Sequence, residues 1–224
     1  MSGMQADPVD RPRILVLASG SGTNLQALID ASRERDFPGD IVAVGSNRPQ
    51  AFALERAAQA GIDTFTVDHT HYDSRDAFDA ALRLEMERRQ PDLVVLAGFM
   101  RILTPDLVRA FQGRMLNVHP SLLPKYRGLN THQRAIDAGD EVHGVSIHFV
   151  TEDLDGGPVI ARAQVPVEPD DTAETLAERV QAREHLLYPI VIRWFCEGRL
   201  QLAGDDQIRF DGEPLDQTLT LPAG

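Results

Sequence analysis

The chain is predicted to fold as an α/β protein with a Rossmann-like, doubly wound, mostly parallel sheet and helices on both faces. Short apolar runs, such as residues 14–18 and 93–97, alternate with stretches whose apolar residues recur at helical spacing. Continuous apolar strands are typical of a sheet that is covered on both faces, and the alternation implies parallel crossover connections. With 224 residues, of which 42% are hydrophobic, the chain can form one such domain with its own core.

Three strand–helix units and a fourth strand account for the first half of the chain. Gly61 directly follows the second expected helix, where glycine commonly supplies the left-handed residue that ends a helix. Phe78, Leu82 and Met86 recur at helical spacing in the third helix. The expected strands are residues 14–18, 41–44, 64–67 and 93–97, and the expected helices are residues 25–31, 51–60 and 74–89.

The second half is less regular, with strands expected at residues 115–119, 142–150 and 159–167. Asp171 with Glu174 resembles a capping box, which would open a helix that runs to about Phe195. Residues 200–202 and 207–210 would form a small hairpin, and the polar segment after Asp211 is expected to fray. We expect one compact domain over residues 13–204, a loose leader over residues 1–12, and a C-terminal hairpin and tail over residues 205–224.

Composition and charge exclude several classes of protein. A formal net charge of −12 argues against nonspecific binding to nucleic acid or to an anionic membrane surface. No apolar run is long enough to span a membrane, and the N-terminus lacks a signal-peptide core. The single cysteine, Cys196, excludes a disulfide scaffold and fits a reducing compartment. We therefore expect a cytoplasmic protein.

A polar pair marks the end of the strand at residues 115–119. Asn117 and His119 are two residues apart, so a strand directs both side chains to the same face. Pro120 ends the strand and Pro124 stiffens the loop that follows. An amide donor beside a titratable donor suits the binding of an oxyanion that forms during acyl transfer. An isolated pair of this kind also occurs where the side chains only cap a strand.

A glycine-rich turn, residues 20–24, joins the first strand to the first helix. Its glycines let the backbone approach an anion, and the helix N-terminal N–H groups would point at a phosphate. A dinucleotide site is the alternative, but Leu25 occupies the position of its third glycine. Asn47 and Arg48 stand where an acidic residue would favour NAD, so the sequence does not exclude NADP as the dinucleotide. A third interpretation is that the turn is only a tight strand-to-helix connection and binds no ligand.

Several separated blocks resemble the folate-dependent formyltransferases, most closely the members that act on glycinamide ribonucleotide. The blocks are residues 19–26, 95–103, 117–128 and 143–160, within a region from about Ile14 to Gly198. Taken together they are more specific than any one motif alone. The resemblance implies the formyltransferase version of the doubly wound fold, with residues 13–204 as the catalytic domain.

The resemblance also implies a reaction and a catalytic set. A formyl group would pass from the cosubstrate 10-formyltetrahydrofolate to the amine of glycinamide ribonucleotide in purine biosynthesis, without a metal. His119 would supply a proton or hydrogen bond to the oxygen that becomes negative, and Asn117 would donate another. Asp155, otherwise an ordinary turn residue, would keep His119 charged, because a nearby carboxylate favours imidazolium. His148, otherwise a core histidine, would support the catalytic group.

Two substrate sites follow from the same resemblance. From the residues alone, Arg75 would be a solvated side chain at a helix start, and Glu184 would lie on an exposed helix face. The implied ribonucleotide-binding residues are Gly22, Thr23, Asn24 and Glu184, and the implied folate-binding residues are Arg75, Met100, Arg101, Ile102, Leu103 and Asn117. The expected partners are these small molecules only, with no nucleic acid and no membrane, and the protein is expected to be a monomer or a homodimer.

Two further features are expected to play no part in catalysis. His69 and His71 form a His-x-His pair of the kind that binds metals, but no cysteine or suitably spaced carboxylate accompanies them. They are expected to be solvated loop residues. Arg127 stands where many relatives have proline, and Thr23 replaces a frequent serine while keeping the hydroxyl group. Neither change is expected to touch a catalytic atom.

Other functions remain as alternatives. Methionyl-tRNA formyltransferase shares the Asn-x-His and Asp set, but it needs a surface that attracts RNA and a further C-terminal domain. Formyltetrahydrofolate deformylase uses water as the acceptor and would need no phosphate loop. An NADP-dependent reductase and a non-catalytic binding module are alternatives from other classes, and the combination of Asn117, His119 and Asp155 argues against the last.

Overall fold

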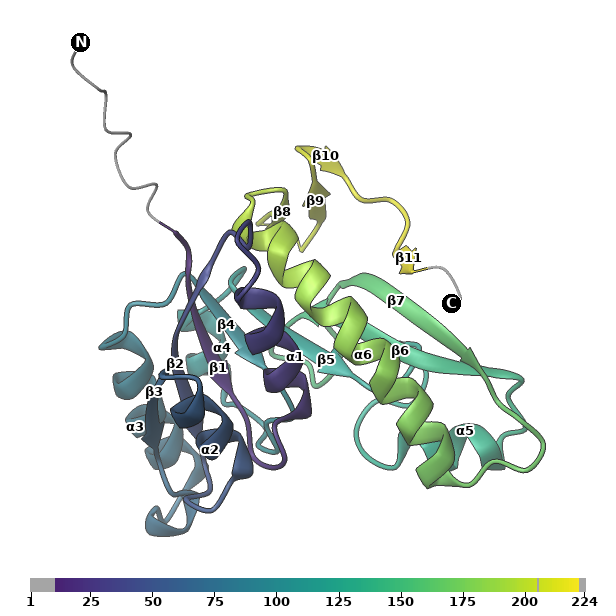
Figure 1. Ribbon diagram of the computed structural model, residues 1–224, viewed down its shortest axis with the longest axis horizontal. Coiled ribbons are helices and arrows are strands. Elements are labelled where there is room, and N and C mark those ends of the chain that lie inside the picture. Colours follow the sequence, from purple (N-terminus) through teal and green to yellow (C-terminus); the bar gives the residue numbers. More distant parts are fainter. Residues whose placement is uncertain (1–10, 205, 222–224) are drawn as a thin grey trace.

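The computed structural model describes residues 11–204 and 206–221 (Figure 1). The expected leader, residues 1–12, lies almost wholly outside the described residues. The main sheet has eight strands in the order β11-β7-β6-β5-β4-β1-β2-β3. Its strands are β1 (Arg13–Leu17), β2 (Asp40–Ser46), β3 (Asp63–Thr66), β4 (Leu93–Leu96), β5 (Met115–His119), β6 (Val142–Phe149), β7 (Val159–Pro166) and β11 (Leu219–Leu221).

The strand pairing confirms the predicted doubly wound, mostly parallel sheet. Strand β1 pairs in parallel with both β2 and β4, so the chain adds strands first on one side of β1 and then on the other. Strands β3 and β5 extend the parallel part, whereas β6 pairs antiparallel with both β5 and β7. The point between β1 and β4 is therefore a topological switch point, where sheets of this kind bind ligands.

Helices cover both faces of the sheet, as predicted. Alternate residues of β1 divide between the faces: Val16 packs with α1, α2 and α6, and Leu17 packs with α3 and α4. Helices α1 and α6 lie side by side across one face (Figure 1). The helices are α1 (Thr23–Ser32), α2 (Phe52–Gln59), α3 (Arg75–Glu87), α4 (Pro105–Ala110), α5 (Thr131–Asp137) and α6 (Ala173–Cys196), with a 3₁₀ turn η1 (His69–His71).

The N-cap residue of the longest helix, α6, is Thr172, one residue later than expected. Its capping box joins Thr172 to Thr175 rather than Asp171 to Glu174. Asp171 accepts a hydrogen bond from the Thr175 hydroxyl group and forms an ion pair with Arg179. The expectation failed by one position because threonine hydroxyl groups satisfy both N–H groups of the box, a role usually filled by serine or threonine with glutamate or glutamine.

The C-terminal segment is more ordered than expected. The predicted hairpin is confirmed as β8 (Leu200–Leu202) and β9 (Ile208–Phe210), which β10 (Glu213–Pro214) extends into a small sheet. The expectation that the chain frays after Asp211 is wrong for the described residues. Strand β11 pairs in parallel with β7, so the tail forms an edge of the main sheet. This pairing joins segments far apart in sequence and leaves no local signal.

Cys196 is buried near the end of α6, and burial raises the pKa of its thiol to about 12, so it is a packing residue. Within the described residues, no helix is long and apolar enough to cross a membrane.

Gly144 allows the close approach of β6 and β7. A Cβ atom at this position would overlap the carbonyl oxygen of Ala163 on the neighbouring strand. We predict that Gly144→Ala lowers the free energy of unfolding by about 2 kcal/mol, because the strands must separate to admit the methyl group. Gly204→Ala is the control, since a Cβ there meets no atom within 4 Å. Equal urea-unfolding midpoints for the two variants would contradict this account.

Candidate active site

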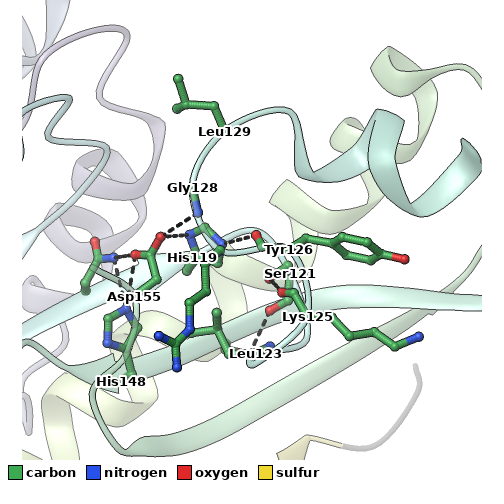
Figure 2. Close-up of polar contacts among 12 residues, drawn as sticks. His119, Ser121, Leu123, Lys125, Tyr126, Gly128, Leu129, His148 and Asp155 are labelled. Atoms are coloured by element: carbon green, nitrogen blue, oxygen red, sulfur yellow. Dashed lines mark hydrogen bonds and ion pairs between the residues drawn. The ribbon is translucent and has the colours of Figure 1, made fainter. Parts of the chain in front are cut away.

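The polar residues expected from the sequence meet at the carboxyl ends of β4 and β5. Strand β5 directs Asn117 and His119 to the same face, as alternation predicts. The antiparallel register of β5 and β6 sets His148 directly opposite Asn117. The loop between β6 and β7 then brings Asp155 to this pair (Figure 2). The structure therefore collects these four residues into one cluster.

Asp155 is the centre of the cluster. Its Oδ2 atom accepts a hydrogen bond from the Gly128 N–H group at 2.9 Å and lies 3.4 Å from His119 Nδ1. Its Oδ1 atom lies 3.5 Å from Asn117 Nδ2 and 3.8 Å from His148 Nε2. The side chain is only 8% exposed, so these contacts are poorly screened by water. The residue has φ of +49°, a left-handed conformation that aspartate tolerates better than most side chains.

Both ring nitrogens of His119 face oxygen atoms. Nε2 lies 2.9 Å from the carbonyl oxygen of Tyr126, and Nδ1 faces Asp155 (Figure 2). A carbonyl oxygen and a carboxylate both accept hydrogen bonds, so an N–H group at either ring position faces an acceptor. His119 is 5% exposed, so these contacts are poorly screened by water. The arrangement presents His119 as a hydrogen-bond donor.

His148 is held in the opposite state. Its Nδ1 donates to the carbonyl oxygen of Phe149 at 2.8 Å, so Nε2 is free to accept from Asn117 Nδ2 at 3.1 Å. Burial lowers the pKa of His148, and the ring is therefore neutral near pH 7. This contact fixes one amide hydrogen of Asn117. The other points at Asp155 across 3.5 Å, a weak contact that leaves it available to a substrate oxygen.

The loop between β5 and α5 covers His119 and is anchored beneath. Ser146 Oγ donates to the Ser121 carbonyl group and accepts from the Leu123 N–H group. Asp140 accepts hydrogen bonds from the Tyr126 hydroxyl group and from Lys125 Nζ. Tyr126 has φ of +56°, which is rare for a bulky side chain and is often associated with functional loops. This conformation directs the Tyr126 carbonyl group onto His119.

The glycine-rich turn forms a second part of the site at the N-terminus of α1. Gly22 has φ of +70°, and a Cβ there would lie 2.7 Å from the Cα atom of Ala53, so only glycine fits without strain. Asn24 Nδ2 donates to Glu184 Oε2 at 2.7 Å, which joins the turn to α6. Thr23 is the first residue of the helix. The free N–H groups at this helix start can bind an anion.

Glu184 departs from the expectation of an exposed helix face. It is 8% exposed, and burial raises the pKa of its carboxyl group. The Oδ1 atom of its partner Asn24 is buried and has no hydrogen-bond partner among the described residues. A buried polar atom without a partner is costly, which suits a position that a ligand completes.

A cavity next to the cluster connects it with the segment after β4. Its lining includes Arg101, Ile102 and Leu103, together with His148 and Asp155. The side chain of Met100 is 56% exposed and does not line this cavity. Arg75 lies at the exposed first position of α3. The structure therefore brings part of the expected folate set to the catalytic cluster and leaves Met100 and Arg75 at its margin.

Only one histidine of the His-x-His pair, His71, is solvated as expected. His69 Nδ1 bonds to the carbonyl oxygen of Asn47 at 2.8 Å, whereas the side chain of His71 is 77% exposed. Within residues 11–204 and 206–221, no group of three or more His, Cys, Asp or Glu side chains is arranged to hold a metal ion.

Another pair of histidines lies beneath the loop and was not singled out from the sequence. His132 Nδ1 lies 3.2 Å from His143 Nε2, and the ring of His143 packs near that of Tyr126. Burial lowers the pKa of both and brings that of His143 to about 4. Neither residue follows a motif that marks such a pair, because the contact joins α5 to β6. The backbone groups of Tyr126 and Gly128 likewise carry no side-chain signal.

Known proteins resemble this chain over most of its length. A protein-family model described as formyl transferase matches residues 12–192. Phosphoribosylglycinamide formyltransferase of Escherichia coli (strain K12) is 55% identical over 189 residues, which are 84% of this chain and 89% of that protein. The enzyme of the same name from Haemophilus influenzae is 46% identical over 206 residues, which are 92% of this chain and 97% of that protein.

Solved structures give the same result. The phosphoribosylglycinamide formyltransferase of Coxiella burnetii superposes with a TM-score of 0.89 at 48% identity, covering 95% of this chain and 100% of that chain. Glycinamide ribonucleotide transformylase 1 of Symbiobacterium toebii superposes with a TM-score of 0.85 at 48% identity, covering 89% of this chain and 94% of that chain.

The buried histidines predict that the fold loses stability as the pH falls. Unfolded histidines titrate at about 6.5, whereas burial lowers the pKa of His132, His143 and His148. Between the native pKa values and about pH 6.5, the unfolded chain binds protons that the native chain does not. The free energy of unfolding therefore decreases as the pH falls. His143→Gln should reduce this loss by about 1 kcal/mol between about pH 7 and pH 5 in urea unfolding. A loss of stability in His143→Gln equal to that of the wild-type protein would contradict the assignment.

Proposed function

The chain belongs to the formyl transferase family, and we propose that its site transfers a formyl group from 10-formyltetrahydrofolate to the primary amine of glycinamide ribonucleotide. The products are formylglycinamide ribonucleotide and tetrahydrofolate, and the reaction is a step of purine biosynthesis. One observation carries the proposal: Asn117, His119 and Asp155 converge beside a cavity that lies between the segment after β4 and the loop after β6.

The proposed chemistry needs no protein nucleophile. The amine of the ribonucleotide attacks the formyl carbon, and the carbonyl π bond opens to leave a negative oxygen on a tetrahedral carbon. The former amine then carries a positive charge and loses a proton. We assign the role of proton acceptor to a water molecule beside Asp155. Collapse reforms the carbonyl group and breaks the bond to N10 of the folate, and N10 takes up a proton from the same water as it leaves.

His119 and Asn117 are the proposed donors to the negative oxygen. Asp155 faces Nδ1 of His119, so Nε2–H is the donor that can pass from the Tyr126 carbonyl group to the substrate. Asn117 can redirect the amide hydrogen that makes only a long contact with Asp155. Two preorganised donors in a site of low exposure stabilise charge more than they would in water. The Tyr126 carbonyl group must move away from His119 for this step.

The ribonucleotide is assigned to the turn at the start of α1. Backbone N–H groups of Gly22, Thr23 and Asn24 suit its phosphate group, because the helix N-terminus is electropositive. Glu184, which accepts a hydrogen bond from Asn24, is assigned to the ribose or glycinamide part. The phosphate-type turn supports a nucleotide acceptor over water, and this distinguishes the proposed reaction from that of a deformylase.

The folate is assigned to the cavity beside the catalytic cluster. Arg101, Ile102 and Leu103 line it and offer backbone groups to a flat heterocycle. Asn117 is assigned to the same cosubstrate, and Met100 and Arg75 are assigned to its outer part. The proposed reaction uses only these two small molecules and no metal. We place it in the cytoplasm and propose a monomer or a homodimer.

Steady-state formyl transfer tests the proposed function directly. Purified protein should convert 10-formyltetrahydrofolate only when glycinamide ribonucleotide is present, as followed by folate absorbance and product mass. Consumption of folate without the amine would indicate a deformylase instead. No consumption in either case would refute the proposed function.

His119→Ala should lower kcat by about 10²–10³, because one donor to the oxyanion is lost. The Kd of each substrate should change by less than about threefold, since the ring serves the transition state. His71→Ala is the matched control and should retain wild-type kcat. A near-normal kcat for His119→Ala would remove His119 from the mechanism.

A further inference from the structure

The segment of residues 100–104, here called the strap, is attached at both ends to buried side chains. At its start, the Met100 N–H group donates to Ser19 Oγ at 2.7 Å. At its end, the Thr104 N–H group donates to Asp79 Oδ2 at 2.5 Å. The two acceptors come from different parts of the chain: Ser19 lies in the turn after β1, and Asp79 lies in α3. The two ends of the strap are thus fixed to separate parts of the fold.

Ser19 is a well-held anchor for the first end. It is 2% exposed, and its hydroxyl group donates to Asn47 Oδ1, which is on a residue only 1% exposed. The single hydroxyl hydrogen is therefore used, and the oxygen lone pairs face Met100. The Ser19 N–H group also donates to the carbonyl oxygen of Gly98. These contacts join the switch point between β1 and β4 to the strap.

Asp79 is an unusual anchor for the second end. It is 2% exposed, and burial raises the pKa of its carboxyl group. The hydrogen bond from Thr104 and the nearby charges of Arg75 and Arg101 act in the opposite direction and favour the carboxylate. Its Oδ1 atom has no hydrogen-bond partner among the described residues. Thr104 is also the N-cap residue of α4, so this bond fixes the point where the strap ends and the helix begins.

The middle of the strap is open by contrast. Within the described part of the chain, the backbone N–H groups of Arg101, Ile102 and Leu103 make no hydrogen bond. The side chains of Met100 and Ile102 are 56% and 53% exposed. Free backbone groups and exposed apolar side chains between two fixed ends are suited to a flat ligand with polar edges.

We propose that Ser19 and Asp79 are positioning residues that hold the strap in the shape that binds the folate cosubstrate. The inference rests on the proposed function, which assigns residues 100–103 to the folate. A strap that is already ordered loses little conformational entropy when the ligand binds, whereas a released strap must be ordered at that moment. Loss of either anchor weakens folate binding and leaves the ribonucleotide site unchanged.

The test compares four variants with the wild-type enzyme in steady-state formyl transfer. Ser19→Ala and Asp79→Ala should each raise the KM for 10-formyltetrahydrofolate about tenfold, with kcat and the KM for glycinamide ribonucleotide within about threefold of wild type. Asp79→Asn keeps an oxygen acceptor for Thr104 and should stay within about threefold of wild type in all three constants. Asp76→Ala, on the exposed side of the same helix, is the control and should match wild type.

Three outcomes would overturn the inference. The folate KM could be unchanged in both alanine variants, both substrate KM values could rise equally, or Asp79→Asn could be as impaired as Asp79→Ala. If Asp79→Ala fails to fold, the folate KM values of Ser19→Ala and Asp79→Asn still test the inference. Absence of formyl transfer by the wild-type enzyme would instead refute the proposed function, so the two failures are distinguishable.

Discussion

The carboxylate of Asp155 joins the separate parts of the site. It accepts a hydrogen bond from the backbone of the loop that covers His119, and it faces both His119 and Asn117. Because the group is almost fully buried, releasing any of these contacts would leave a charge or a polar atom without a partner. The strand pair β5–β6 and the two loops that follow these strands are thereby held in one arrangement. The Tyr126 carbonyl oxygen lies 2.9 Å from the second ring nitrogen of His119, so the ring is held between this carbonyl group and the carboxylate.

The doubly wound sheet places the two proposed substrate sites on either side of one switch point. The turn after β1 and the strap after β4 lie on either side of the switch point, and Ser19 bonds the two together. The antiparallel pairing of β6 with β5 then adds His148 opposite Asn117. A neutral His148 orients the amide group of Asn117. His119 instead lies between the Tyr126 carbonyl group and the Asp155 carboxylate.

Local patterns were enough to predict the sheet, most of its helices, and the shared face of Asn117 and His119, because strand alternation and helical spacing are properties of adjacent residues. Asp155 entered only through the family resemblance, since nothing local distinguishes it from an ordinary turn aspartate. The burial of Glu184 and the anchoring by Asp79 depend on contacts between distant elements, and an acidic residue on an amphipathic helix is normally exposed. The pairing of β11 with β7 was missed for the same reason.

The most direct test of this account is the kcat of Asp155→Asn in formyl transfer. Asparagine can keep an oxygen acceptor for the Gly128 N–H group, but it removes the negative charge beside His119. The account predicts that kcat falls by about 100-fold, because the charge that faces both proposed oxyanion donors is lost. A near-normal kcat would show that the charge of Asp155 does not support these donors.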